Sequence, residues 1–245
     1  MEIRVTGEDA DSYEEVMLIY QAALRQMETK LAVLNEEFRM VHKYNPIEHI
    51  TSRVKKSESI AKKLRRHGYD VTLENMVKYC NDIAGVRVIC SFTSDIYRIA
   101  DMISNQSDIR VLAIKDYIAS PKPSGYRSYH MIVMIPVYLS DRIVDTKAEI
   151  QIRTIAMDFW ASLEHQLRYK TDIEIPDSIR HDLTDIADDM FKTDLKMSQI
   201  SRRIQRISRV KHEAQELAKK AKAAEAGGAG ADAGNAADPG NAGGR

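Results

Sequence analysis

Several residue types and patterns are scarce in this chain of 245 residues, and each scarcity excludes a class of protein. The only cysteines, Cys80 and Cys90, lack a CxxC spacing, which argues against a disulfide framework or a cysteine metal site and predicts buried thiols in a reducing cytoplasm. The longest apolar run, Met131 to Leu139, is too short to span a bilayer, and the acidic N-terminus has no hydrophobic signal region. We therefore expect a soluble, cytoplasmic protein with no membrane partner.

An excess of charge of one sign is also missing. Lys and Arg together number 36, as do Asp and Glu, so the formal net charge is zero and long duplex DNA is not an expected partner. The charge is uneven, however, because seven Lys or Arg and one acid lie between Thr51 and His67. This local excess is suited to a polyphosphate.

Common nucleotide-binding and hydrolase signatures are absent as well. No Walker A sequence and no GxGxxG occurs, which excludes the P-loop and Rossmann classes. His181 and Asp182 form an HD dipeptide without the further spaced histidines and aspartates of a hydrolase, so we interpret them as surface residues of a helix. Seven of the eleven glycines lie in the Ala/Gly-rich segment 225–245, which predicts a disordered tail and makes Gly85 and Gly125 noteworthy.

Hydrophobic periodicity predicts an α/β core between long terminal helices. The expected helices cover residues 9–42, 52–66, 93–105, 155–169 and 176–224. The expected strands cover residues 83–92, 109–114, 131–139 and 144–153, and the last two are expected to be antiparallel neighbours. The expected regions are an N-terminal helical region, a catalytic core, C-terminal helices and the tail, with bounds 1–50, 51–175, 176–224 and 225–245.

Cations gather on one face of the second expected helix. Lys55, Ser59, Lys63 and Arg66 follow one another at steps of four, four and three, which places them on one side of a helix. An adjacent apolar flank would hold this side against a core and present the cations to a ligand. A merely solvated charged face is the alternative. Arg53 is expected at the start of the same helix.

Two carboxylates are expected on strands. Asp82 opens the strand 83–92, where a cap or turn role is the alternative, and Glu149 lies on the polar side of the alternating strand 144–153. Asp82 and Arg87 are five residues apart, so on a regular strand their side chains would point to opposite faces. Either a bulge at Gly85 brings them to one side, or Arg87 acts from another face. Mg²⁺ binds one or two carboxylates together with phosphate oxygens, so the pair could hold it.

The loop before the strand 131–139 combines cations, an aromatic ring and a glycine. Lys122, Gly125, Tyr126, Arg127 and His130 lie within nine residues beside two prolines, which suits a nucleotide phosphate and base.

The helix 155–169 carries an acid in its first turn, Asp158, which also favours the helix dipole. Trp160 is expected in the core, and His165 is interpreted as structural rather than catalytic. The expected buried face consists of Ile155, Phe159, Leu163 and Leu167.

Five ordered motifs resemble the synthetase domain of RelA/SpoT-type enzymes, and more closely the stand-alone small alarmone synthetases of the RelQ kind. The motifs are SRVKKSESI, NDIAGVRVIC, KDYIASPKPSGYRSYH, AEIQIRT and MDFWASLEHQLRYK. The resemblance covers roughly residues 10–200, and we expect neither a hydrolase domain nor a long C-terminal regulatory region. It implies a nucleotidyltransferase-like α/β fold, a mixed β-sheet flanked by helices. It also implies transfer of pyrophosphate from ATP to the 3′-hydroxyl of GTP or GDP, which yields pppGpp or ppGpp and AMP.

The resemblance also implies roles for individual residues. Asp82 and Glu149 would be catalytic and would bind Mg²⁺. Arg53 and Arg87 would sandwich adenine, where a guanidinium plane suits stacking. The ATP phosphates are assigned to Lys55, Ser59, Lys63 and Arg66. Guanine would stack on Tyr126 and be read by Asp158, and the rest of the acceptor is assigned to Lys115, Lys122, His130, Gln151 and Arg153.

Relatives of this kind form homotetramers through their terminal helices, and some bind regulatory pppGpp or single-stranded RNA, so the resemblance implies these partners here. His49 stands where close relatives carry a phenylalanine that helps bind the regulatory nucleotide, which counts against activation by pppGpp. Three alternatives stay open: a nucleotidyltransferase with another acceptor, a non-catalytic module that binds nucleotide or RNA, and a helical scaffold protein.

Overall fold

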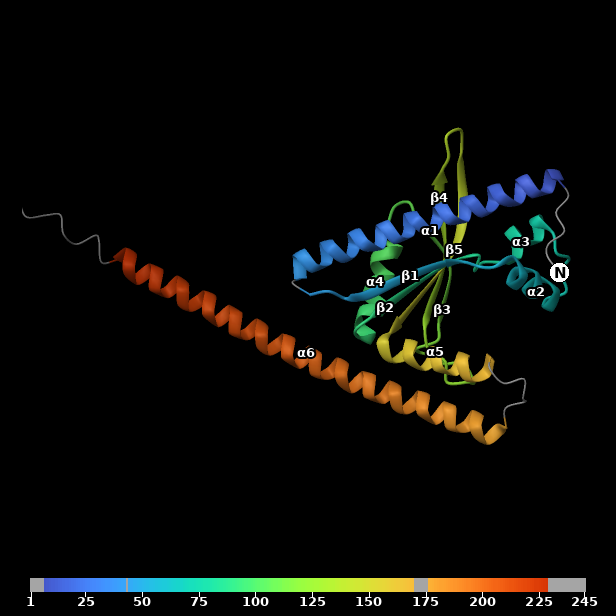
Figure 1. Cartoon of the computed structure of the whole chain (residues 1–245). Helices are drawn as coiled ribbons and strands as arrows, with labels where there is room; N and C mark the ends of the chain where they lie inside the picture. Colours follow the sequence, from blue (N-terminus) through green and yellow to red (C-terminus); the bar gives the residue numbers. More distant parts are fainter. Residues whose placement is uncertain (1–6, 43, 170–175, 229–245) are drawn as a thin grey trace, which may run out of the picture. The chain divides into compact units, whose positions relative to one another are not determined.

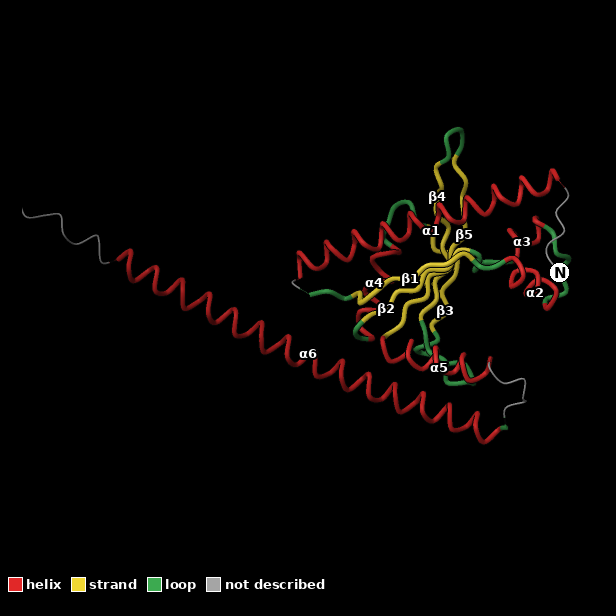
Figure 2. Tube along the Cα trace, viewed as in Figure 1, coloured by secondary structure: helices red, strands yellow, loops and turns green. Residues whose placement is uncertain are grey.

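The structure is a computed structural model that describes residues 7–42, 44–169 and 176–228, and the chain divides into two units, residues 1–198 and 199–245. The first unit contains a β-sheet with helices on both sides (Figures 1 and 2). The helices are α1 (Gly7–His42), α2 (Ser57–Arg66), α3 (Leu73–Tyr79), α4 (Thr93–Ser104), α5 (Ile155–Tyr169) and α6 (Asp177–Gly228). The strands are β1 (Ile47–Val54), β2 (Ala84–Cys90), β3 (Arg110–Asp116), β4 (Tyr129–Tyr138) and β5 (Ile143–Thr154).

The sheet has five strands in the order β1-β2-β5-β4-β3. β2 and β5 are parallel, and the other neighbours are antiparallel. The expected mixed sheet flanked by helices is therefore confirmed, and so is the antiparallel pairing of β4 with β5. The long N-terminal helix is confirmed as α1, which ends before Pro46.

One face of the sheet forms the core and the opposite face carries polar groups. Apolar residues of β2, β4 and β5 pack with α1 and α4, where Met27 and Leu31 of α1 are fully buried. Figure 1 shows α1 crossing this side of the sheet and α5 lying on the other. Each such buried side chain stabilises the fold by about 1.5–3 kcal/mol. Because alternate residues of a strand point to opposite faces, this burial turns the intervening polar residues to the other side.

The prediction of a single helix over residues 52–66 was wrong in its first part. Residues up to Val54 belong to β1, which pairs with β2, and α2 begins only at Ser57. Arg53 is therefore a strand residue. β1 lies at the edge of the sheet and most of its residues are partly or fully exposed, so its sequence lacks the apolar run that marks a buried strand.

Helix α3 was missed by the sequence analysis. Thr72 caps its start by accepting a hydrogen bond from the backbone amide of Asn75, with a nitrogen–oxygen distance of 3.2 Å. A threonine before a short polar and apolar run is a signal that could have indicated this helix.

The expected buried face of α5 was also wrong. The side chains that bury instead are Met157, Trp160 and Ala161, and the Trp160 indole donates to the carbonyl of Leu183 at 3.0 Å, which confirms Trp160 as a core residue. Helical periodicity identifies an apolar stripe but not the element that covers it. The four residues expected to be buried are 42–57% exposed: Ile155, Phe159, Leu163 and Leu167.

Other expectations on single residues are met. Cys80 and Cys90 are free, buried thiols, and burial raises the pKa of both. His181 and Asp182 are exposed on α6. Among the described segments, no helix has the length and the apolar content that crossing a membrane requires.

Helix α6 extends to Gly228, past the expected end at residue 224, and residues 229–245 of the expected disordered tail lie outside the described part of the chain. In the second unit α6 is the described element, and nearly all of its side chains from residue 199 to 221 are exposed.

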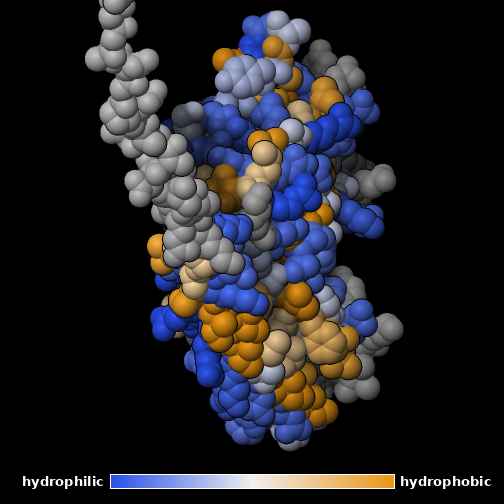
Figure 3. All heavy atoms as spheres, turned by 90° about the vertical axis from the view of Figure 1, so that its left-hand side faces the viewer, coloured by the Kyte–Doolittle hydropathy of each residue, from blue (hydrophilic) through white to orange (hydrophobic). Residues whose placement is uncertain are grey.

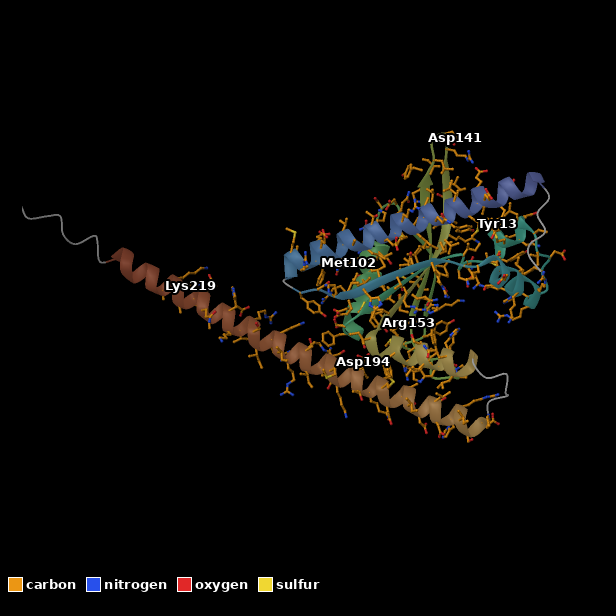
Figure 4. All side chains as sticks on the ribbon, in the orientation of Figure 1. Tyr13, Met102, Asp141, Arg153, Asp194 and Lys219 are labelled. Carbon is orange, nitrogen blue, oxygen red and sulfur yellow. The ribbon has the colours of Figure 1, made fainter. Side chains whose placement is uncertain are left out.

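A buried carboxyl group joins α6 to the end of β5. Asp194 is 7% exposed and accepts a hydrogen bond from the Thr154 hydroxyl at 2.8 Å (Figure 4). Burial raises the pKa of Asp194, and its hydrogen bond with Thr154 offsets only part of this effect. A carboxyl group with a raised pKa in the folded state destabilises the fold as the pH rises through that pKa, because the buried group must then ionise.

We therefore expect Asp194→Asn to gain stability relative to the wild type as the pH rises from 4 to 8. Urea unfolding of both proteins at the two pH values measures this change. All other titrating groups are shared, so their effects cancel in the difference. A free-energy difference that stays constant with pH would contradict the prediction.

Candidate active site

A pocket of about 170 Å³ lies on the polar face of the sheet over β1, β2 and β5. Directly paired residues of neighbouring strands share a side of the sheet, so the strand pairing determines which residues meet there. One row crosses all five strands, and a second row lies two residues away and contains Glu149. The first row, which we call the polar row, consists of Thr51, Arg87, Gln151, His130 and Lys115. The pocket is lined by six of the expected site residues, Arg53, Lys55, Asp82, Arg87, Glu149 and Gln151.

Asp82 and Arg87 line the same pocket without the expected bulge at Gly85. β2 pairs with β1 and with β5 without a register shift at this glycine, so the bulge hypothesis was wrong. Asp82 precedes the first residue of β2, Ala84, and strand alternation does not apply to it. The conflict between opposite faces therefore disappears because the strand begins later than expected.

Two lysines neutralise Asp82. Lys55 Nζ lies 2.7 Å from Oδ2 and Lys63 Nζ lies 2.7 Å from Oδ1. Burial by itself would raise the pKa of Asp82, but the hydrogen bonds and charges of the two lysines outweigh it, and the pKa is lower than usual. Asp82 is therefore an anion at neutral pH.

A second pocket, of about 220 Å³, shares Lys55 and Asp82 with the first. The basic face that the sequence predicted lines it, although Lys55 lies in the connection between β1 and α2 rather than on the helix. Lys62 also lines it and was missed, because it lies off the stripe of three- and four-residue steps. The complete lining is Lys55, Ser59, Lys62, Lys63, Arg66 and Asp82.

Glu149 is held between two side chains of the polar row. Gln151 Nε2 donates to Oε2 at 2.8 Å, and His130 Nδ1 lies 3.2 Å from Oε1. Burial would raise the pKa of Glu149, but these hydrogen bonds and the charge of His130 lower it overall. A second oriented, ionised carboxylate thus faces the pocket that contains Asp82.

The Tyr126 hydroxyl connects the loop to the polar row. It lies 2.9 Å from His130 Nε2 and accepts a hydrogen bond from Arg153 Nη2 at 2.6 Å. Lys122 Nζ lies 4.9 Å from the centre of the Tyr126 ring. Tyr117, which the sequence analysis missed, packs edge-on against both Tyr126 and His130. The loop therefore surrounds an aromatic ring with cations.

Asp158 links the loop side of the site to the first pocket. Its Oδ1 is 3.0 Å from Arg153 Nη1 and 3.3 Å from Arg87 Nη1. Arg153 is buried and also donates to the Gln151 side-chain oxygen at 3.0 Å. Figure 4 shows Arg153 on the side of the sheet that faces α5. All but one of the expected site residues therefore line one of the two pockets or belong to this network of contacts. The exception is Lys115, which is exposed on β3 beside His130.

This arrangement is suited to bringing two polyphosphates together. Asp82 and Glu149 are ionised oxygen donors that line one pocket, and Mg²⁺ binds carboxylates of this kind together with phosphate oxygens. Cations on both sides of the carboxylates offset the repulsion between phosphate groups.

Comparison with known proteins gives consistent matches. The family described as "Region found in RelA / SpoT proteins" matches residues 52–174. The GTP pyrophosphokinase YwaC of Bacillus subtilis is 44% identical over 209 residues, which cover 83% of this chain and 100% of that protein. The structure of small alarmone synthetase 2 from Bacillus subtilis is similar with 45% identity and a TM-score of 0.70, covering 76% of this chain and 97% of the other. Small alarmone synthetase 1 from the same organism, bound to its product pppGpp, matches with 35% identity and a TM-score of 0.72, covering 79% and 98%.

The fold and the site define a nucleotide-dependent transferase of phosphate groups, with two carboxylates in one pocket, cations of α2 beside it and a cationic loop on the other side. The chain belongs to the RelA/SpoT family, and it is a homologue of the small alarmone synthetases.

Proposed function

We propose that the chain is a GTP pyrophosphokinase, which transfers pyrophosphate from ATP to the 3′-hydroxyl of GTP or GDP and so makes pppGpp or ppGpp together with AMP. The observation that carries this proposal is the placement of Asp82 and Glu149 in one pocket, with cations toward α2 and an aromatic, cationic loop on the other side. Such an enzyme works where ATP and GTP are present, so we place it in the cytoplasm.

The donor ATP is assigned to the side of β1 and α2. Arg53 and Arg87 lie on paired strands and line one pocket, so their guanidinium planes can stack on the two faces of adenine. Lys55, Ser59 and Lys63 line the adjoining pocket and would bind the phosphates, with Arg66 beside them.

The acceptor is assigned to the loop and α5. Tyr126 would stack on guanine, and Asp158 would accept hydrogen bonds from guanine N1–H and N2–H₂, donors that adenine lacks in this arrangement. Four residues around Tyr126 and one at the end of the polar row would bind the ribose and phosphates. These are Lys122, His130, Gln151, Arg153 and Lys115.

The reaction requires one bond to form and one to break. The acceptor 3′-oxygen attacks the β-phosphorus of ATP, and the bond from that phosphorus to the oxygen of the α-phosphate breaks, which releases AMP. Glu149 is ionised and takes the proton of the 3′-hydroxyl. Asp82 and Glu149 would hold Mg²⁺, which supplies charge neutralisation at the phosphates when bound.

Chromatography of nucleotides after incubation with ATP, Mg²⁺ and either GTP or GDP tests the proposal. We expect a guanosine penta- or tetraphosphate together with an equal amount of AMP. Formation of ADP would indicate phosphate transfer and would contradict the proposal. Nucleotide binding without product, with and without added pppGpp, would favour the non-catalytic alternative.

The same assay addresses the regulatory ligands. Small alarmone synthetase 1 from Bacillus subtilis has been solved with its product pppGpp bound, and His49 is exposed on β1 here. We propose that the rate of synthesis is insensitive to added pppGpp, because a histidine provides a smaller stacking surface than phenylalanine at this place. Single-stranded RNA is added in a parallel reaction.

We also propose a homotetramer, in which the exposed apolar residues of α6 take part. Ile200, Ile204 and Ile207 follow at steps of four and three and are 47–68% exposed. Figure 3 shows that hydrophobic side chains also interrupt the hydrophilic surface on the face that it draws. Such a stripe is stabilised when a second helix covers it.

Ile204→Asp is expected to convert the tetramer into smaller species, because a charge would lie in the apolar stripe. Light scattering coupled to size-exclusion chromatography measures the mass. Gln205→Asp adds the same charge on the neighbouring exposed residue and should keep the tetramer. An unchanged mass for Ile204→Asp would exclude this part of α6 from the interface.

A further inference from the structure

The first turns of α6 contact the loop between β3 and β4 that carries Tyr126, which we call the acceptor loop. α6 begins at Asp177, beyond the end of the matched family region at residue 174. We define the α6 wall as Thr184, Ala187, Asp188 and Phe191, which contact the residues on either side of Tyr126. Both the wall and the loop belong to the first unit of the chain.

Gly125 is the point of closest approach. Its backbone has φ +83°, and a Cβ atom at this position would lie 2.6 Å from Ala187 Cβ and 3.4 Å from Thr184 Cα. The tight turn is closed by the Gly125 amide, which donates to the Lys122 carbonyl at 2.8 Å. Only glycine therefore fits between the turn and α6, and the helix limits how far this side of the loop can move.

Arg127 anchors the other side of Tyr126. Its Nη2 lies 2.9 Å from Asp188 Oδ1, and its guanidinium group stacks 4.0 Å from the centre of the Phe191 ring. Nη1 donates to the Ile118 carbonyl at 3.2 Å, so Arg127 joins the start of the loop to α6. The Arg127 side chain is only 13% exposed, while Asp188 is 50% exposed, so the pair is fixed on the loop side and screened by solvent on the α6 side.

The Tyr126 ring itself packs against the same region. It contacts a small cluster formed by Trp160, Ala161 and Ala187, in which Met190 also takes part. α5 and α6 thus form one support beneath the ring, and the loop residues before and after Tyr126 are both fixed to α6.

We infer that the α6 wall positions Tyr126 and thereby sets the affinity for the guanine nucleotide, so that Ala187 and Asp188 are positioning residues of the reaction. The inference rests on the proposed function of Tyr126 as the stacking partner of the acceptor. A displacement of a binding group by about 1 Å can change a rate by up to about 100-fold. No residue of the α6 wall lines either of the two pockets assigned to ATP, so the effect should fall mainly on the acceptor.

Gly125→Ala is the first test. The added methyl group meets Ala187, so the loop must move, and we expect the KM for GTP or GDP to rise by about 10- to 100-fold while the KM for ATP changes by less than about twofold. The double variant Gly125→Ala with Ala187→Gly removes the methyl group in its path and should recover much of the acceptor affinity. Gly68→Ala is the matched control, because Gly68 also has positive φ (+78°) but no atom near its Cβ position.

Asp188→Asn is an independent test that leaves the backbone unstrained. It removes the charge that holds Arg127, and we expect the acceptor KM to rise by about three- to tenfold with an unchanged KM for ATP. Asp189→Asn is its control, since the ion pair that Asp189 makes among the described residues lies within α6, with the exposed Lys192.

Direct binding separates failure of this inference from failure of the proposed function. Titration with a fluorescent GDP analogue and with a non-hydrolysable ATP analogue reports both affinities even if no alarmone forms, and circular dichroism monitors the fold. Weaker GDP binding with unchanged ATP binding supports the inference. Equal losses for both nucleotides, no loss in Asp188→Asn, or no rescue by Ala187→Gly would each overturn it.

Discussion

Replacing Glu149 by glutamine, or Asp82 by asparagine, is expected to lower kcat by about 1,000-fold or more and to leave the fold intact. Glu149 is an oriented anion that accepts hydrogen bonds from His130 and Gln151, and a neutral amide can neither take the proton of a 3′-hydroxyl nor offer the same charge to Mg²⁺. Asparagine at position 82 would also leave Lys55 and Lys63 without their carboxylate partner.

Single-turnover synthesis of the alarmone measures the effect, with circular dichroism and thermal unfolding as tests of the fold. Glu48→Gln is a matched control, because Glu48 is an exposed β1 residue that accepts a hydrogen bond from Ser91 outside the lining of the pockets. Product formation close to wild type by either active-site variant would disprove the assignment of the carboxylates.

The pH dependence follows from the same two groups. Both pKa values are lower than usual, so each carboxylate stays ionised as the pH falls and is protonated only below the ordinary range of about 4. Any loss of activity between pH 7 and pH 5 therefore has to come from another group.

Tyr126→Ala is expected to raise the KM for GTP or GDP by about 10- to 100-fold, because stacking of a base on an aromatic ring contributes about 1–3 kcal/mol. The KM for ATP should change little, since Tyr126 lines neither of the two pockets assigned to ATP. Steady-state kinetics with each nucleotide varied in turn measures both constants.

Tyr126→Phe separates the ring from the hydroxyl. It retains the stacking surface but removes the hydrogen bonds to His130 and Arg153, so we expect a smaller increase in the acceptor KM than for alanine. Tyr138→Ala, at an exposed tyrosine of β4, is the control and should leave both constants unchanged. An acceptor KM that is unaffected in Tyr126→Ala would refute the stacking role.

The alternating pattern of β5 was sufficient to place Glu149, Gln151 and Arg153 on one side of a strand. Strand alternation is a local property with a period of two residues, and the local sequence reports it directly. The ends of α1 and α5 were likewise predicted to within a few residues. The motif spacing likewise identified the family before any contact was known.

The partners of those residues were decided by the tertiary structure. Lys55 and Lys63 meet Asp82 across 27 and 19 residues of chain, and Asp188 meets Arg127 across 61. The exposed stripe of α5 shows the same limit, because a helical period does not reveal which element lies against it. The sequence by itself thus determined the type of α1, α4, α5, α6 and of β2 to β5, the faces of β5 and the chemical class of the site, but neither β1 nor α3. The pairing of β1 with β2, the neutralisation of Asp82 and the support of the Tyr126 loop by α6 depended on contacts between distant segments, which local periodicity does not encode.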